Sequence, residues 1–485
     1  MSISGSLNNA LSGLRAAGRG SEVVASNISN ALTEGFAQRG LSLSPSQIGG
    51  AGGVQINGIT RFVDPVLIAD RRLADAEFGN VLANSRFLAD LETLVGDPES
   101  DASLSGRLSQ FEVSLISAAS RPDLPQRHDL AIDSAKDLSA NLKGISDGLQ
   151  KLRSDADSSI NAQVTRLNEA LQQVEKLNTQ IIATSRGRDT QHAALLDLRQ
   201  QVVDEISEMV PVREVSRDYG AIALYTTGGA ILLDGSAATL EFSPTRVIVP
   251  HMTVQNTLLS GLTINGLPVR TGSDDGVLRG GSIGAQFAIR DETAVAAQAQ
   301  IDAVARDLVE RFQDPAVDPT LLPGDAGLFT DGGLAFAAMN EIGLSGRLAI
   351  NTAVDPAQGG EAWRLRAGIG AAVPGEVGDA TLLTALRDAL SAGRTPASGS
   401  FGTSPQSAFD LSAHIHSQIG ADRFAMDRSM SFSANSLQAL TQIELESGVD
   451  TDAELQHLMV LEQAYAANAR VIEAVDEMMQ SILRL

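Results

Sequence analysis

Apolar side chains recur at alternating intervals of three and four residues near both ends of the chain. This spacing places them along one face of a helix and is typical of helices that pack against each other over their length. The amino-terminal seam comprises Ile3, Leu7, Ala10, Leu14, Ala17, Ser21, Val24 and Ile28, and the carboxyl-terminal seam comprises Leu458, Leu461, Tyr465, Asn468, Ile472, Val475, Met479 and Ile482. Two such seams at the tips of a long chain indicate that the ends associate, with each other or with further copies of the chain.

The same helical spacing recurs between the two ends. The longest pattern covers residues 138–181 and predicts a rod about 65 Å long at ~1.5 Å per residue. From Ala156 to Val164 two intervals of four residues follow each other. This break in the alternation of three and four locally unwinds a supercoil. Gly35 is expected to be a left-handed cap after the first helix, and residues 451–454 a capping box before the last. Further helices are expected at residues 4–30, 66–94, 104–115, 195–209, 283–312, 381–392, 411–440 and 451–482.

From about residue 212 the apolar period changes to two, which is the period of strands. Residues 221–225 and 230–233 flank Thr227-Gly228-Gly229 and predict a hairpin. Residues 40–60 are rich in glycine and serine and predict an extended linker with one short strand. Other strands are expected at residues 247–249, 253–259 and 262–264, the last followed by an Asn265-Gly266 turn, and at residues 348–350 and 363–366.

The order of these elements predicts an α+β fold. Its core is long, helical and coiled-coil-like and is formed by the amino- and carboxyl-terminal regions, with β-rich domains inserted between them. The expected parts are 1–60 (amino-terminal helix and linker, an inner assembly domain that pairs with 448–485), 61–210 (helical body), 211–280 (β-rich insert), 281–313 (helix returning to the body), 314–405 (mixed insert rich in glycine, alanine and proline), 406–447 (body helix) and 448–485 (carboxyl-terminal assembly helix).

Charge and composition exclude several functions. The formal charge of −23 argues against nucleic acid as a partner, because its phosphates would be repelled. Residues 1–60 hold three arginines and two acidic residues (net +1), whereas residues 440–485 hold nine acidic residues and two arginines (net −7), a difference that favours pairing of the ends. Cysteine is absent, so no disulfide or thiolate site is expected. No apolar run of about 18 residues predicts membrane insertion, and no basic-then-apolar segment predicts a cleaved signal peptide.

One segment resembles the nucleophile elbow of serine hydrolases. Gly280-Gly281-Ser282-Ile283-Gly284 has the required glycine spacing, but an elbow needs a buried strand before the serine, and residues 274–279 make a poor one. His414 or His416 would have to be brought to Ser282 by the fold to supply a base. We therefore expect a glycine-rich turn before a helix, and a secreted acidic hydrolase using Ser282 is the alternative from another class of function.

No catalytic, metal or cofactor site is predicted elsewhere. His414 and His416 are two residues apart, so on a helix they do not share a face for one metal ion. The acidic residues 97–101 and the turn at 323–325 lack the ligand number and spacing of a calcium loop. Gly368-Ile369-Gly370 begins like a dinucleotide fingerprint, but Val373 occupies the place of the third glycine.

Short motifs lie at both ends of the chain and in its helical middle. At the ends they are Ser6-Leu7-Asn8-Asn9-Ala10-Leu11-Ser12-Gly13-Leu14, Ser26-Asn27-Ile28-Ser29-Asn30-Ala31, Thr33-Glu34-Gly35-Phe36, Ser447-Gly448-Val449-Asp450, Gln463-Ala464-Tyr465-Ala466-Ala467-Asn468-Ala469-Arg470-Val471-Ile472 and Asp476-Glu477-Met478-Met479. These resemble the axial proteins of the bacterial flagellum, which form its rod, hook and hook-associated parts. Leu177-Asn178-Thr179-Gln180-Ile181 and Leu195-Leu196-Asp197-Leu198-Arg199 are similar to the hook-associated protein 1 (FlgK) family. Phe36, Asp450 and Ser29 depart from the usual tyrosine, asparagine and alanine.

The resemblance implies a structural, self-assembling protein without enzymatic activity, placed in a ring at the junction between hook and filament. It implies type III export, without a cleaved signal peptide, to the extracellular axial structure that serves motility. The implied partners are copies of the chain, the hook protein, the second hook-associated junction protein, and an export chaperone of the FlgN type on the carboxyl-terminal helix. A hook or rod protein is the alternative within the class. The implied assembly residues are Leu7, Leu11, Leu14, Asn27, Ile28, Asn30, Gly35, Phe36, Leu458, Leu461, Tyr465, Ala469, Ile472, Val475, Met479 and Ile482.

Overall fold

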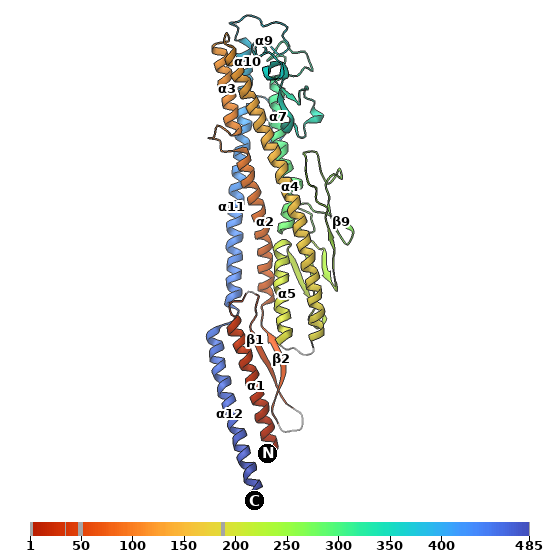
Figure 1. Ribbon diagram of the computed structural model, residues 1–485, viewed down its shortest axis with the longest axis vertical. Coiled ribbons are helices and arrows are strands. Elements are labelled where there is room, and N and C mark those ends of the chain that lie inside the picture. Colours follow the sequence, from red (N-terminus) through yellow and green to blue (C-terminus); the bar gives the residue numbers. More distant parts are fainter. Residues whose placement is uncertain (1–2, 34, 47–51, 186–189, 485) are drawn as a thin grey trace.

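The chain forms an elongated molecule in which long helices run along its length (Figure 1). The computed structural model describes residues 3–33, 35–46, 52–185 and 190–484. Both ends of the chain lie at the same end of the molecule, where the first and last helices form a two-helix tip beyond the body (Figure 1).

The helices are α1 Ile3–Asn30, α2 Pro65–Val95, α3 Leu104–Ser120, α4 Pro125–Thr184, α5 Thr190–Met209, α6 Ser282–Ala288, α7 Ala294–Phe312, α8 Leu344–Arg347, α9 Arg364–Ala367, α10 Thr381–Ser391, α11 Ala408–Glu446 and α12 Thr451–Leu483. The strands are β1 Arg39–Pro45, β2 Val54–Arg61, β3 Val212–Ser216, β4 Ile222–Thr226, β5 Ile231–Asp234, β6 Ser236–Ala237, β7 Leu240–Glu241, β8 Leu262–Ile264, β9 Leu267–Val269, β10 Phe329–Asp331 and β11 Leu348–Ile350.

Helix α4 is the central element of the body and runs for 60 residues, about 90 Å at ~1.5 Å per residue. It begins at Pro125, a residue that suits the first turn because the N–H it lacks would be unpaired there. The rod predicted at residues 138–181 is confirmed, and the helix extends beyond it on the amino-terminal side. Ala156, Ile160 and Val164 are all buried, so α4 stays packed through the interrupted repeat. The other expected helices are also confirmed to within a few residues.

Two apolar cores follow each other along α4. The first surrounds Phe111, Phe312 and Phe329, whose ring centroids are 5.2–5.9 Å apart, and it joins α3, α7, α10 and α11 to the amino-terminal half of α4. The second is mainly aliphatic and packs the carboxyl-terminal half of α4 and α5 on the sheets, through residues such as Leu171 and Leu224. One continuous helix therefore connects both cores and makes the body a single rod.

The β-rich part consists of two small antiparallel sheets, with strand orders β3-β4-β5-β6 and β7-β8-β9. The predicted hairpin is confirmed as β4 and β5. The Asn265-Gly266 turn joins β8 to β9, and its two residues have φ of 52° and 76°, as this two-residue turn requires. The strand expected at residues 348–350 is confirmed as β11, paired with β10. The strands expected at residues 247–249 and 253–259 are wrong.

Residues 245–259, all of them described, form no strand, for two reasons. Residues 253–259 form turns closed within the segment, such as the hydrogen bond from Leu259 N to Thr253 O at 3.2 Å, and the backbone of residues 245–252 has partners on α4. Ser154 Oγ accepts a hydrogen bond from Ile248 N at 3.3 Å. The buried Arg153 donates to the carbonyl oxygens of Val249 and Met252 at 3.4 and 2.7 Å. Polar side chains of a helix thus replace the neighbouring strand, a substitution that apolar alternation in the sequence cannot reveal.

The strand expected at residues 363–366 is also wrong, because Arg364–Ala367 form the short helix α9. The alternation that suggested a strand has a different cause. Leu365 is buried in the core, while Arg366 donates to the carbonyl oxygens of Pro374 and Val377 at 2.8 and 2.7 Å. Arginine bonded to loop carbonyls therefore holds this irregular part of the chain in place of regular sheet.

The linker expected at residues 40–60 is wrong in its form, since β1 and β2 make an antiparallel hairpin with an irregularity between Ser42 and Leu43. Gly35 has the expected positive φ of 75°, but it lies in a turn closed by a hydrogen bond from Phe36 N to Thr33 O rather than directly after α1. Glu34, in the same expected cap, is outside the described residues. Among the described helices none is both long enough and apolar enough to cross a bilayer.

Arg311 on α7 ties the irregular insert to the body. It is 2% exposed, donates to Ala389 O at 2.7 Å and pairs with Asp307. Arg311→Leu leaves Asp307 buried without its partner, so the free energy of unfolding should fall by about 3–5 kcal/mol. The exposed pair of Arg387 and Asp388 gives the control, and Arg387→Leu should change that free energy by less than about 1 kcal/mol. Urea denaturation followed by circular dichroism measures both, and equal losses would contradict the role of Arg311.

Candidate assembly interface at the paired terminal helices

Helices α1 and α12 lie antiparallel against each other at the tip (Figure 1). Three pairs of facing residues define their register, each seven residues from the next on both helices. The pairs are Gly13 with Asn468, Gly20 with Leu461, and Asn27 with Glu454. The helices therefore keep one heptad register, which is the pattern of an antiparallel coiled coil.

Small residues on α1 let the two backbones approach closely. A methyl group on Gly20 would lie 3.0 Å from Leu461 Cδ1, and one on Gly13 would lie 2.8 Å from the side-chain amide of Asn468. At this seam the small residues leave shallow depressions on α1, and larger side chains of α12 fill them. The buried residues of α1 are Ala10, Ala16, Ala17, Gly20, Val23, Val24 and Asn27.

A second side of α1 packs on the β1–β2 hairpin. Ser12 Oγ accepts a hydrogen bond from Val54 N at 3.1 Å. Val23 joins Ile59 of β2 and Ala193 of α5 in a small apolar cluster. These contacts leave a third side of α1 uncovered.

Asn27 is fully buried at the end of α1 nearest the body. Its Oδ1 accepts a hydrogen bond from Arg39 N at 3.0 Å, and its Nδ2 donates to Arg39 O and to Glu454 Oε1, both at 2.8 Å. Gln38 Nε2 donates to the same Glu454 oxygen at 2.8 Å. The amide of Asn27 thus pairs with β1 as a neighbouring strand would, while it also holds α12.

The capping box expected at residues 451–454 is wrong. Asp450 is the N-cap of α12, and its carboxylate accepts hydrogen bonds from Asp452 N and Ala453 N at 2.9 and 3.0 Å. Glu454 is 3% exposed and bonded to Asn27 instead. A buried carboxylate needs buried donors, and only Asn27 and its neighbours provide them there, whereas the start of the helix is already capped.

From Arg39 a chain of polar contacts continues into the body. Asp197 of α5 pairs with Arg39 of β1 and, at 2.6 Å, with Arg61 of β2. Arg61 also bonds to Gln200 of α5, whose Nε2 donates to Glu444 of α11 at 3.2 Å. The hairpin is therefore fixed to two helices of the body.

Helix α2 joins the same network. Arg71 and Arg72 share Asp204 of α5 at 2.7 and 2.6 Å, and Arg71 also pairs with Glu444. Burial by itself would lower the pKa of Arg71, but the charges of Asp204 and Glu444 outweigh it and raise that pKa. The polar contacts thus run without interruption from α12 to α2, α5 and α11.

On α12, the predicted assembly residues Leu458, Leu461, Ile472 and Val475 lie at the heptad positions that face α1. Val475 is 3% exposed, and the other three are half-buried. The remaining predicted residues on this helix are Tyr465, Met479 and Ile482, all exposed, and Ala469, half-buried on the flank of the seam. Their role in assembly stays a prediction.

On α1, the leucines do not fill the seam with α12. Gly13, Gly20 and Asn27 face α12, and the only signal of this in the sequence is their spacing of seven residues. The predicted amino-terminal seam therefore mixes two faces of the helix. Its Ala10, Ala17 and Val24 are buried, whereas Leu7, Leu14 and Ile28 are half-buried, and the predicted residue Leu11 is 36% exposed.

Three further predicted residues lie at the end of α1 nearest the body. Asn30 donates to Ser26 O of its own helix at 2.8 Å. The guanidinium of Arg39 lies 4.6 Å from the ring centre of Phe36. A methyl group on Gly35 would lie 2.6 Å from Gln201 Cγ. These residues shape the turn between α1 and the hairpin, and their part in assembly also stays a prediction.

Ser282 does not occupy a nucleophile elbow. It is the first residue of α6 and follows turns rather than a strand, so the expected glycine-rich turn before a helix is confirmed. Its hydroxyl donates to Gln163 Oε1 at 2.6 Å. His414 and His416 lie on α11, where the ring of His414 packs edge-on against Phe401 with ring centres 5.3 Å apart. The strained strand-to-helix turn that exposes a nucleophilic serine is not formed here.

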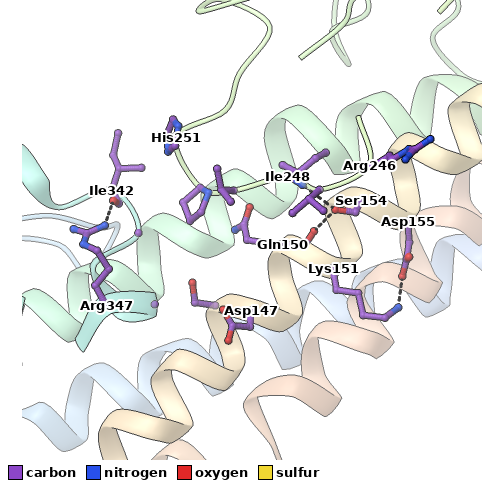
Figure 2. A pocket seen from close by; sticks show the side chains of 16 residues that line it. Asp147, Gln150, Lys151, Ser154, Asp155, Arg246, Ile248, His251, Ile342 and Arg347 are labelled. Atoms are coloured by element: carbon purple, nitrogen blue, oxygen red, sulfur yellow. Dashed lines mark hydrogen bonds and ion pairs between the residues drawn. The ribbon is translucent and has the colours of Figure 1, made fainter. Parts of the chain in front are cut away.

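A groove of about 660 Å³ lies between α4, residues 246–251 and the start of α8 (Figure 2). Lys151 in this groove pairs with Asp155 at 2.6 Å, and Arg347 donates to Ile342 O at 2.9 Å. Both interactions stay within their own segments, and the irregular segment is joined to α4 in this groove by the hydrogen bond from Ile248 N to Ser154 Oγ at 3.3 Å. The described residues contain no group of three or more side chains suited to a metal ion.

The close approach at Gly20 can be tested by a larger residue. Gly20→Leu should push α12 away from α1, because overpacking costs about 1–3 kcal/mol. Amide hydrogen exchange of residues 454–475 in the full-length monomer should then become about tenfold faster. Gly18 is the matched control, since a methyl group there meets no heavy atom within 4 Å. Equal exchange in Gly20→Leu and Gly18→Leu would show that the seam does not depend on Gly20.

The role of Asn27 can be tested against a second asparagine of the same helix. Asn27→Ala leaves the buried Glu454 and the backbone of Arg39 without partners, so the tip should lose about 1–3 kcal/mol of stability. Asn30→Ala removes only a bond within α1 and should change it by less than about 0.5 kcal/mol. Hydrogen exchange at β1 and at the first turns of α12 measures the difference. Similar losses of stability in both variants would contradict the role assigned to Asn27.

Two family models match the chain. The model described as flagellar hook-associated protein FlgK helical domain matches residues 88–325, and the model described as flagellar basal body rod FlgEFG protein C-terminal matches residues 445–485. The first match runs from within α2 to beyond α7, and the second contains α12. Together they cover the part of the body from the end of α2 to α7 and one helix of the tip.

Curated relatives agree with these models, and one solved structure is similar over part of the chain. Flagellar hook-associated protein 1 of Salmonella typhimurium is 28% identical over 263 residues, 52% of this chain and 47% of that protein, so the chain spans about half the length of this relative. The protein of the same name in Bacillus subtilis is 22% identical over 95% of this chain and 94% of that protein. The flagellar hook junction protein FlgK of Burkholderia pseudomallei, a solved structure, is 21% identical, with a TM-score of 0.45, and the match covers 55% of this chain and 47% of that chain. The chain belongs to the FlgK family of flagellar hook-associated proteins.

Proposed function

We propose that this protein is a structural subunit of the flagellum that forms the junction between hook and filament by assembling with copies of itself. The observation that carries the proposal is the tip, in which two terminal helices are held together while both keep apolar side chains open to solvent. On α12, Val460 is 61% exposed and Met478 is 48% exposed. Apolar side chains gathered on one pair of helices favour packing against a neighbouring subunit.

The junction is favoured over the hook or the rod by the helical body. The family model for residues 88–325 is specific to FlgK, and the relatives are named hook-associated protein 1. The model for residues 445–485 carries the name of rod proteins, which supports a terminal helix shared more widely among axial proteins. A hook or rod protein is the second candidate, and α12 is the part of the chain that favours it.

We infer that the protein acts by assembly and not by catalysis. Its family is one of structural flagellar proteins. Ser282, the one hydrolase candidate, has its hydroxyl bonded to Gln163 at the start of a helix. We therefore assign the protein no substrate and no cofactor.

The proposed partners are further copies of the chain in a ring, the hook protein on one side of the ring and the second hook-associated junction protein on the other. The exposed apolar residues of α12 need a cover before assembly, which supports an export chaperone of the FlgN type on residues 458–482. We propose type III export without a cleaved signal peptide as the route to the extracellular end of the hook.

Complementation tests the junction role. Cells lacking this gene receive either the full chain or a chain ending at Gly448, which removes α12. The full chain should restore filaments, and the shortened chain should leave bare hooks and flagellin monomer in the medium. Electron microscopy and an immunoblot of the medium measure these outcomes. Filaments with both chains would contradict a role for α12 in the junction.

A single charge in the seam between α1 and α12 should act like the truncation. Leu461→Asp or Ile472→Asp places a carboxylate against α1, so the pair should open and incorporation into hooks should be lost, while the body stays folded. Gln456→Asp, on the exposed side of the same helix, is the control and should be incorporated normally. Circular dichroism of the purified chains and immunoblots of isolated hooks measure folding and incorporation. Normal junctions with Leu461→Asp would remove this seam from the assembly mechanism.

A further inference from the structure

A pocket of about 240 Å³ lies where the start of α2, the middle of α5 and β3 meet. Helices α2 and α5 lie side by side in this part of the body (Figure 1), and β3 is an edge strand of its sheet. The lining residues belong to segments 63–73, 196–200 and 212–216, together with Thr227. The pocket is therefore separate from the paired helices of the tip.

Arg199 of α5 lines this pocket and is only 9% exposed. Its Nη1 donates to Asn178 Oδ1 at 3.0 Å and to Gly220 O at 2.6 Å. Among the described residues, neither its Nε nor its Nη2 has a hydrogen-bond acceptor, and no carboxylate oxygen lies within 4 Å of the guanidinium. A buried charge ordinarily has both, so Arg199 has donors to spare for an anion in the pocket.

The free donors of Arg199 distinguish it from two other buried arginines. Arg153 and Arg366 also lack an ion pair within the described parts of the chain, but each of them donates to three backbone carbonyl oxygens. Their charge is thus compensated by the dipoles of the protein itself. Arg199 donates to a single carbonyl, so the protein alone compensates its charge less completely.

The charges around the pocket favour an anion. The pKa of Arg199 is lowered to about 10, chiefly by burial and also by the charges of Arg61 and Arg72, against which the charge of Glu214 acts. The guanidinium is still charged at neutral pH. Three arginines and one glutamate line the pocket (net +2), although the whole chain carries −23. Glu214 is occupied by Arg72 at 2.8 Å, whereas Arg213 is exposed and has no ion pair with any described residue.

The rest of the lining is largely apolar. Ile68 and Val212 are 8% and 4% exposed, and Val63 and Leu73 are each 42% exposed. Apolar side chains therefore line the pocket from the core to the surface. A hydrated inorganic ion gains nothing from such walls, whereas a hydrocarbon group removes them from water.

We propose that this pocket binds a small organic carboxylate with an apolar tail. The carboxylate accepts two parallel hydrogen bonds from Nε and Nη2 of Arg199, the planar arrangement that a guanidinium favours, and the tail lies against Val63, Ile68 and Leu73. The volume holds about eight non-hydrogen atoms at ~30 Å³ each, the volume that a molecule occupies in liquid water. The proposal goes beyond the junction role and does not depend on it.

A ligand here would also act on the polar contacts that join the tip to the body. Arg72 and Gln200 line the pocket, and both belong to the network that links α2, α5, the hairpin and α11. A ligand that binds only the folded arrangement stabilises it. Hydrogen exchange in α5 and β3 should therefore slow when the pocket is filled.

Calorimetric titration of the purified full-length chain tests the proposal with four probes. The first is 4-methylpentanoate, which has eight non-hydrogen atoms. Its amide keeps the tail without the charge, acetate keeps the charge without the tail, and inorganic phosphate is a plain anion. The carboxylate with the tail should bind, and the amide should bind at least about tenfold more weakly because it loses the charge-assisted bonds to Arg199. Acetate and phosphate should also bind at least about tenfold more weakly, since they leave the apolar walls uncovered.

Variants assign the binding to this pocket. Arg199→Gln should weaken binding of 4-methylpentanoate at least about tenfold. Arg213→Gln removes an exposed charge and should weaken it about threefold. Arg246→Gln is the matched control, since Arg246 is exposed, lies outside the pocket and has no ion pair with a described residue, and it should leave binding unchanged. Circular dichroism shows whether each variant is folded.

A second variant decides the matter if Arg199→Gln does not fold. Ala69→Phe keeps every arginine but adds a ring to an exposed residue of the lining, so it should weaken binding at least about tenfold. The absence of binding to the unaltered chain would overturn the proposal. Equal binding of the acid and its amide would remove Arg199 from the site, and phosphate that binds as tightly as 4-methylpentanoate would show a simple anion site. Unchanged binding in Ala69→Phe and Arg213→Gln would place any observed binding outside this pocket.

Discussion

The buried amide of Asn27 is the contact on which the arrangement of the tip depends. It meets the backbone of Arg39 on one side and the carboxylate of Glu454 on the other, so one side chain fixes α1, β1 and α12 relative to each other. Asp197 of α5 pairs with Arg39 of β1 and with Arg61 of β2, which fixes the hairpin relative to α5. Without these contacts, the direction of the two terminal helices would depend on the packing of α1 on the hairpin and on the short segments that join the helices to the hairpin and to α11.

Polar contacts suit this position because the orientation of the terminal helices matters there more than the strength of the contact. Hydrogen bonds and ion pairs hold their partners at defined distances and angles, whereas apolar surfaces tolerate sliding. The side chains of Arg39 and Asp197 are 7% and 11% exposed, and a pair so far removed from water adds little net stability when complete but is strongly destabilising when one partner is lost. The network therefore favours one arrangement of α1, the hairpin and α12, because any other arrangement would leave charges buried without partners.

The long helices could be predicted from the sequence, and contacts between distant segments could not. The apolar period of α4 repeats over many turns, so local pattern is sufficient to define it. Glu454 reads as part of a local capping box, but its partner Asn27 is 427 residues away and no local rule contains that information. On α1, the pattern combined two adjacent seams because contact positions occupied by Gly13 and Gly20 do not register as apolar. The face of α12 that meets α1 was predicted better, since its contact residues are large and apolar.

The pairing of small residues on α1 with larger residues on α12 explains how closely the two helices of the tip fit together within one chain. Gly20 leaves the space that Leu461 fills, and Val475 is buried on the same side of α12. The fit covers only part of the apolar surface of α12, since Tyr465 and Met479 remain 46% and 47% exposed. Exposed apolar area favours association with other surfaces, so the tip of the single chain is closed along one line of contact and adhesive on the rest of α12.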